Sequence, residues 1–135
     1  MKKTWLATLV CCLVTSVGLA YYSPWRSRTH ARLPAISGLP YHKARKELLA
    51  AGWQPLRTKS FNEVDTDPDI SSGNGPLFWR RGYIELEASS GTGLGCCAFL
   101  FNDAYGNRLR VCTAGEELPR RKAYATVTNF EFVSD

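Results

Sequence analysis

Residues 94–113 read LGCCAFLFNDAYGNRLRVCT, which is two apolar runs on either side of a polar turn. The runs at 94–101 and 108–113 are rich in residues that favour strands. The six residues between them, 102–107, include Asn, Asp and Gly, which are typical of tight turns. This stretch predicts an antiparallel β-hairpin, around which the rest of the chain can be interpreted.

Three cysteines fall in this hairpin. Pairing Phe101 with Arg108 places Cys97 opposite Cys112, and in an oxidising compartment these two would form a disulfide. That bridge closes a loop of about 15 residues and would contribute roughly 3 kcal/mol on the chain-entropy model. A register one residue away would pair Cys96 instead of Cys97 with Cys112 and would exchange the two faces of the strand. The third, unpaired cysteine would be either a buried thiol or a link between two molecules. In the first register the core-facing side carries Cys96, Ala98, Leu100, Leu109 and Val111, and the other side carries Phe99, Phe101, Arg108 and Arg110.

A helix is predicted before the hairpin. Tyr41, Ala44, Leu48 and Ala51 recur at helical spacing among charged residues, Pro40 suits a first helical position, and Gly52 suits a helix end. After the helix, strand-forming runs at 53–57, 82–88 and 124–133 join the hairpin, and residues 62–76 form a loop. The predicted fold is therefore α+β, with one N-terminal helix packed on an antiparallel sheet of four to five strands.

The N-terminus indicates export. Lys2 and Lys3 precede an uncharged apolar stretch at 5–20 that ends in Gly18-Leu19-Ala20, the pattern of a secretory signal. An apolar run of this length is also close to the lower limit for a membrane-spanning helix, so an uncleaved anchor is the alternative. We expect a signal peptide or anchor at 1–20, a basic tether at 21–32 and a single domain at 33–135. The domain would lie in the periplasm, either free or held at the inner membrane.

The charge balance argues against nucleic acid as a partner. The chain has a net charge of +5, with 17 basic and 12 acidic side chains. Without Lys2 and Lys3, 15 basic side chains remain and the net charge falls to +3. These cations are scattered in small groups, whereas a nucleic-acid-binding domain usually concentrates them on one face.

No cofactor or metal is expected. The glycine-rich segment at 91–95 leads into a strand, whereas a phosphate-binding loop opens a helix. The alternating acidic residues from Asp65 have Ile70 and Pro76 at the sixth and twelfth positions, where a calcium loop needs glycine and a carboxylate. A zinc site would need a fourth ligand beside the three cysteines, and His30 and His42 lie far from them in the sequence.

Catalytic groups are equally scarce. No Gly-x-Ser-x-Gly motif is present, and neither histidine has the context of a base. Glu85 and Glu87 would share one face of a strand, and paired carboxylates can hydrolyse glycosides, which keeps a small hydrolase as an alternative. A solvent-facing strand explains the same pair, and we expect no enzymatic activity.

One segment suggests recognition. Trp79, Arg80, Arg81 and Tyr83 follow one another closely, and Trp, Tyr and Arg dominate protein-binding hot spots. We expect these four residues to form a binding patch. The alternative is that Phe78 and Trp79 cap the core while the arginines point into water.

Two resemblances support an envelope location. Leu33-Pro34-Ala35-Ile36-Ser37-Gly38, followed by Ala44, Leu48, Leu49 and Ala51-Gly52, resembles the start of PASTA modules over about 25 residues, which implies recognition of muropeptides or penicillin. The chain also resembles small periplasmic proteins of Gram-negative bacteria, on Tyr41, Ala44, Arg45, Gly52-Trp53 and the later Gly91–Gly93. The cysteine hairpin and glycine-rich turn have no PASTA counterpart.

The sequence therefore predicts an exported, non-catalytic protein that binds a protein partner in the envelope, as an immunity protein or enzyme inhibitor does. The alternatives are a PASTA-like module that binds peptidoglycan and a small hydrolase. We expect no contact with nucleic acid, and membrane attachment only through an uncleaved N-terminal segment.

Overall fold

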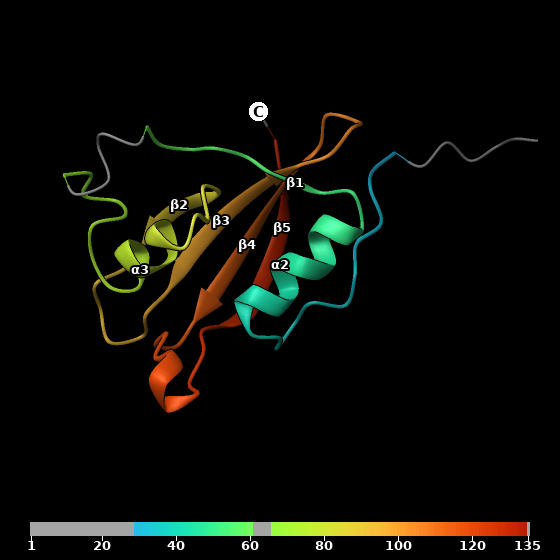
Figure 1. Ribbon diagram of the computed structural model, residues 1–135. Coiled ribbons are helices and arrows are strands. Elements are labelled where there is room, and N and C mark those ends of the chain that lie inside the picture. The colour runs from blue at the N-terminus through green and yellow to red at the C-terminus, as the bar shows by residue number, and fades with distance from the viewer. Residues whose placement is uncertain (1–28, 61–65, 135) are drawn as a thin grey trace, which may run out of the picture.

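The computed structural model describes residues 29–60 and 66–134 (Figure 1). The predicted signal or anchor at 1–20 and most of the tether lie outside these residues. The fold is α+β, with a five-stranded antiparallel sheet and a few short helices. Its elements, in chain order, are α2 (Tyr41–Ala50), β1 (Gln54–Pro55), α3 (Gly75–Arg80), β2 (Leu86–Ser89), β3 (Cys97–Asn102), β4 (Arg108–Ala114), the 3-10 helix η1 (Pro119–Arg121) and β5 (Thr126–Val133).

The sheet is built around the predicted hairpin. Its strand order is β1-β3-β4-β5, and β2 also pairs with β3. The short strands β1 and β2 share one edge of β3, with β1 beside Phe101 and Asn102 and β2 beside residues 97–99. Both α2 and α3 lie over the same face of this sheet, as Figure 1 shows.

Helix α2 forms where the sequence predicts to within one residue at each end, with Pro40 and Ala51 as its caps rather than as helical residues. Pro40 stands just before the first residue of the helix. Gly52 lies just beyond the end of the helix and has a φ of +99°, a conformation that residues with a Cβ atom rarely adopt. Tyr41, Ala44 and Leu48 form its buried stripe. The ring of Tyr41 stacks on Phe99 of β3 with 3.6 Å between centroids, which ties the helix to the centre of the sheet.

The core lies between this helix layer and one face of the sheet. Each fully buried large side chain contributes about 1.5–3 kcal/mol relative to an exposed position. The largest fully buried apolar side chains are Ile36, Tyr41, Leu48, Trp53, Ile70, Phe78, Leu86, Phe99, Phe101, Leu109 and Val111. No helix within 29–60 and 66–134 is long and apolar enough to cross a membrane.

The predicted register of the hairpin is wrong by one residue. Asn102, rather than Phe101, pairs with Arg108, so Ala98 lies opposite Cys112. The turn therefore has five residues, and the N–H of Asp103 bonds the carbonyl of Asn107 across it at 3.0 Å. On β4 the predicted core side is correct, with Leu109 and Val111 buried. On β3 the predicted sides are exchanged: Cys97, Phe99 and Phe101 are buried, and Cys96, Ala98 and Leu100 lie on the outer side.

The physical reason is the size of the side chains. Burying Phe99 and Phe101 removes more apolar surface from water than burying Ala98 and Leu100. The sheet now separates Cys97 from Cys112, and the predicted Cys97–Cys112 disulfide is not formed; Cys96, Cys97 and Cys112 are free thiols. Burial raises the pKa of the Cys97 thiol to about 11, despite its hydrogen bond to Ser89.

A second difference concerns the segment before the hairpin. Residues 75–80, which the sequence placed at the end of a loop and in the junction before a strand, form helix α3 instead. Pro76 stands in its first turn, where a missing N–H costs nothing. The predicted strand at 82–88 is correspondingly shifted to β2, Leu86–Ser89.

Candidate functional site

The structure divides the predicted binding patch. Helix α3 turns Phe78 and Trp79 inward, and Trp79 is only 8% exposed. Arg80 and Arg81, at the end of the helix, are exposed. Trp79 is therefore a core residue, as in the alternative that the sequence left open, and only the two arginines remain available for a partner.

Tyr83 also has a structural role. Its ring lies 5.9 Å from that of Phe78 and 5.5 Å from that of Tyr41. The guanidinium of Arg45 sits 4.7 Å from the centre of the ring, a cation–π contact. Tyr83 is half-buried between α2 and α3 and connects their packing.

Beneath this ring lies a buried carboxylate. Glu85 has no exposed surface, and its Oε1 accepts hydrogen bonds from Tyr41 Oη at 2.8 Å and Arg45 Nε at 2.6 Å. Burial, and next the charge of Glu85, raise the pKa of Tyr41 well above its ordinary value. Tyr41 therefore stays protonated and donates a hydrogen bond to the carboxylate. This arrangement fixes an ion pair inside the fold.

Glu87 belongs to another surface. Its carboxylate accepts two hydrogen bonds from Arg110, at 2.7 Å from Nε and 2.9 Å from Nη2, on the outer face of the sheet. Glu85 and Glu87 thus hold different arginines and do not face one site. The pairing of carboxylates on which the hydrolase alternative depended is absent from the described structure.

Arg81 is bound to the wall of a groove that the sequence did not reveal. It lies between α3 and the connection from β4 to β5, has a volume of about 660 Å³, and is floored by Leu77, Leu118 and Pro119. A second hollow, at the glycine-rich turn, adjoins it and shares Leu77 and Leu118. We call the two together the α3–η1 groove. Its remaining lining residues are Gly73, Asn74, Gly91, Thr92, Gly93, Gly95, Glu116, Glu117, Arg120 and Arg121.

Asn74 connects the walls of the groove. Its Nδ2 donates to the carbonyl oxygens of Gly95, at 3.1 Å, and Gly115, at 2.8 Å. Its Oδ1 accepts from the N–H of Glu117 at 3.1 Å. Two loops, the glycine-rich turn and the connection after β4, are thereby held to the start of α3 by one buried side chain, and the groove is preorganised.

Glu117 completes this framework. Its carboxylate accepts from Arg81 Nη1 at 2.6 Å and from the N–H of Ala125 at 2.9 Å, and it is almost fully buried. Arg81 is therefore held at the groove by a partly buried ion pair. No local pattern in the sequence marks Asn74 or Glu117, because their partners lie in other segments of the chain.

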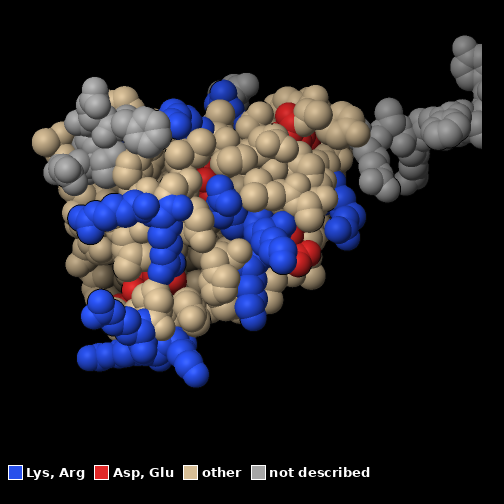
Figure 2. Space-filling view, in the orientation of Figure 1, with Lys and Arg blue, Asp and Glu red and all other residues tan. Residues whose placement is uncertain are grey.

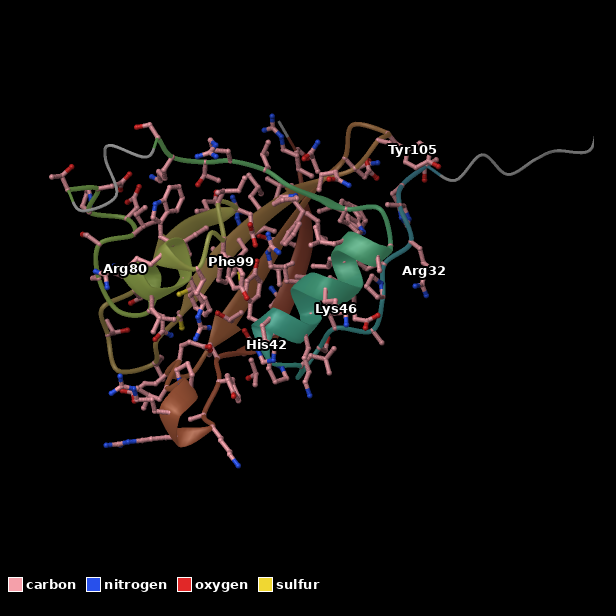
Figure 3. All side chains as sticks on the ribbon, viewed as in Figure 1. Arg32, His42, Lys46, Arg80, Phe99 and Tyr105 are labelled. Atoms are coloured by element: carbon pink, nitrogen blue, oxygen red, sulfur yellow. The ribbon has the colours of Figure 1, made fainter. Side chains whose placement is uncertain are left out.

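Basic side chains form the rim of the groove. Arg120 and Arg121 line it and Arg81 is bound to Glu117 in its wall; all three are exposed, as are the neighbouring residues Arg80 and Lys122 and the acidic lining residue Glu116. Figure 2 shows basic side chains at the left, over α3, and at the lower left, over η1, with acidic side chains between them, and Figure 3 shows Arg80 at the left edge, pointing away from the fold. Two large apolar side chains are exposed at this end of the molecule, Leu94 at 70% and Leu118 at 36%.

Comparison with known proteins found no relative of this chain: no family model, no curated protein and no solved structure matches it. The function is therefore inferred from the geometry and charge of the α3–η1 groove.

Proposed function

We propose that this protein is an exported, non-catalytic binding protein of the periplasm that recognises an acidic segment of a protein partner. The α3–η1 groove is the contact surface. The observation that carries this proposal is the combination of an apolar floor, made by Leu77, Leu118 and Pro119, with exposed arginines at its edge, Arg120 and Arg121 in the lining and Arg81 bound to Glu117.

The floor and the rim have different roles. A partner's apolar side chain that enters the groove would remove Leu118 and Leu77 from water, which supplies affinity. The cations would pair with carboxylates around that side chain, which orients the partner and speeds association. The partner segment we expect carries an apolar anchor flanked by Asp or Glu.

The framework behind the groove supports binding without rearrangement. Asn74 and Glu117 fix the loops through hydrogen bonds of 2.6–3.1 Å, so little conformational freedom is lost when a partner binds. Small rigid domains of this kind suit an immunity protein or an enzyme inhibitor, which acts by covering a surface of its target.

The test is capture of partners from the cell envelope. Full-length protein with a C-terminal tag would be compared with the double variant Arg120→Glu/Arg121→Glu, which reverses two exposed charges on the groove. The matched control is Lys43→Glu/Lys46→Glu, which makes the same change of charge on the exposed face of α2. We expect the groove variant to bind the captured partner at least about tenfold more weakly, because loss of about 1.4 kcal/mol already has that effect.

The control variant should capture the same partner as the wild type. Equal loss in both variants would show that capture depends on net charge alone and would contradict the proposal. Retention of all three proteins on purified cell-wall sacculi, with no captured protein, would favour the PASTA-like alternative of peptidoglycan binding.

A further inference from the structure

The end of the sheet opposite the groove has a different surface. Strand β4 runs from Arg108, next to the hairpin turn, to Ala114, next to the groove, so the two ends lie roughly 20 Å apart. Figure 1 shows the hairpin turn and η1 at opposite ends of the molecule. We call the residues Arg32, Tyr105 and Phe132 the turn-end surface.

The chain enters the domain at this end. The carbonyl of Thr29 accepts from Asn107 Nδ2 at 2.7 Å, and the N–H of Ala31 donates to Asp103 Oδ2 at 2.8 Å. The same carboxylate accepts from the N–H groups of Tyr105 and Asn107 within the turn. Asp103 is nearly buried, so the first described residues are bound firmly to the hairpin turn.

Aromatic and basic side chains gather there. Tyr105 is 59% exposed at the tip of the turn, and Phe132 is 49% exposed and lies 5.2 Å from the ring of His30. Arg32, on the segment through which the chain enters, is exposed as well. Figure 3 shows Tyr105 and Arg32 on the side of the molecule where the chain enters, with Arg32 on the entering segment and Tyr105 above it.

The number of residues before Thr29 limits how far the turn-end surface can lie from the apolar stretch at 5–20. Eight residues, 21–28, separate the stretch at 5–20 from Thr29. Fully extended, they span at most roughly 30 Å. If the apolar stretch stays in a bilayer, the turn-end surface is therefore the part of the domain held closest to it.

We propose that residues 5–20 are retained as a membrane anchor and that the turn-end surface rests on the bilayer. Tyrosine is enriched where membrane meets water, and arginine is attracted to anionic headgroups. In this orientation the α3–η1 groove points away from the membrane, toward a partner in the periplasm. The inference rests on the proposed export of the protein but not on the role of the groove.

The experiment uses the full chain purified from membranes and reconstituted in vesicles of phosphatidylethanolamine and phosphatidylglycerol. A photo-crosslinking phenylalanine analogue would replace Tyr105 in one protein and Leu94, at the groove end, in another. Both positions are exposed, so neither replacement disturbs the core. We expect lipid adducts from position 105 and few from position 94.

A charge variant makes the test more specific. Arg32→Glu should lower the adducts at position 105 by roughly fivefold, the effect of one cation near an anionic surface, whereas Arg80→Glu at the groove end should not. Equal adducts at positions 105 and 94 would overturn the proposal. So would a mature protein that begins after Ala20, as measured by mass spectrometry. Either result leaves the partner-capture test of the groove unaffected.

Discussion

Glu85 shows how single residues stabilise this fold. A buried carboxylate is costly unless donors compensate for the lost water. Here Tyr41 and Arg45 supply two hydrogen bonds of 2.8 and 2.6 Å to the same oxygen. Tyr41 also stacks on Phe99, so its ring and its hydroxyl act on different neighbours.

Tyr41→Phe separates these two roles. The ring remains, but the hydrogen bond to Glu85 is lost, and we expect the free energy of unfolding to fall by about 1–3 kcal/mol. Because the folded pKa of Tyr41 is raised, its contribution is complete below the unfolded pKa of about 10 and is lost as the pH rises through the folded pKa. Urea unfolding at neutral and alkaline pH measures both effects.

The matched control for this prediction is Tyr105→Phe, which changes an exposed tyrosine. Its stability should equal that of the wild type at both pH values. A Tyr41→Phe protein as stable as this control would mean that the hydrogen bond to Glu85 contributes nothing.

Asp103 has a comparable role at the hairpin turn. Burial tends to raise the pKa of its carboxyl, but hydrogen bonds from Ala31, Asn107 and Tyr105 outweigh burial and hold the pKa below its usual value. Its contribution to stability is therefore present above the unfolded pKa of about 3.9 and is lost as the pH falls through the folded pKa.

Asp103→Ala should therefore destabilise the protein by about 3 kcal/mol at pH 7, because several buried donors lose their acceptor. The difference in the free energy of unfolding between the variant and the wild type should shrink in acid. Urea unfolding at pH 7 and in acid provides the measurement, and Glu47→Ala, at an exposed position of α2, is the control. An equal difference in the free energy of unfolding at both pH values would contradict the lowered pKa of Asp103 in the folded protein.

At the scale of elements, the register of β3 against β4 decides which side chains reach the core. A shift by one residue exchanges the two faces of a strand. The observed pairing of Ala98 with Cys112 puts Phe99 and Phe101 inside and leaves Cys112 on the outer face.

Ala98→Cys tests this register. Directly opposed residues in an antiparallel pair have Cα atoms roughly 4.5–5.5 Å apart, within the range of a disulfide. We expect oxidation of the variant to join the new cysteine to Cys112, as mass spectrometry of disulfide-linked peptides would show. Leu100→Cys, which lies opposite Arg110, should not form this bond. A Cys97–Cys112 disulfide in the native protein would contradict the observed register.

At the scale of the whole molecule, the surface is polarised along the strands. The basic groove lies at one end, and the aromatic turn-end surface lies at the other, where the chain enters. The modest net charge of +5 hides this asymmetry, because the cations of the rim come from two segments about 40 residues apart in the sequence.

This distribution predicts strong salt dependence for partner binding. Raising the ionic strength from about 0.05 M to about 0.5 M shortens the screening length and should weaken binding at least about tenfold. Arg120→Glu/Arg121→Glu should show a smaller dependence on salt, and Lys43→Glu/Lys46→Glu the same dependence as the wild type. Titration of the captured partner at several salt concentrations is the measurement. Binding that does not depend on salt would contradict a contact through the basic rim.

The sequence by itself determined the features that depend on neighbouring residues. Helix α2 follows from the spacing of Tyr41, Ala44 and Leu48 and from Gly52, and the hairpin turn follows from the Asn, Asp and Gly residues at 102–107. The buried side of β4 was equally predictable, because Leu109 and Val111 alternate with Arg108 and Arg110. The same alternation is missing from β3.

Only the tertiary structure decided which face of β3 is buried and where the groove forms. Residues 96–101 are apolar on both sides of the strand, so their pattern cannot select a register. The burial of Phe99 and Phe101, with Phe99 packed against Tyr41 and Phe78, selects it. The groove depends on Asn74 and Arg81 meeting residues 36 to 43 positions away. Local patterns report which face of an element is apolar, but contacts at such separations exist only once the whole core has been packed.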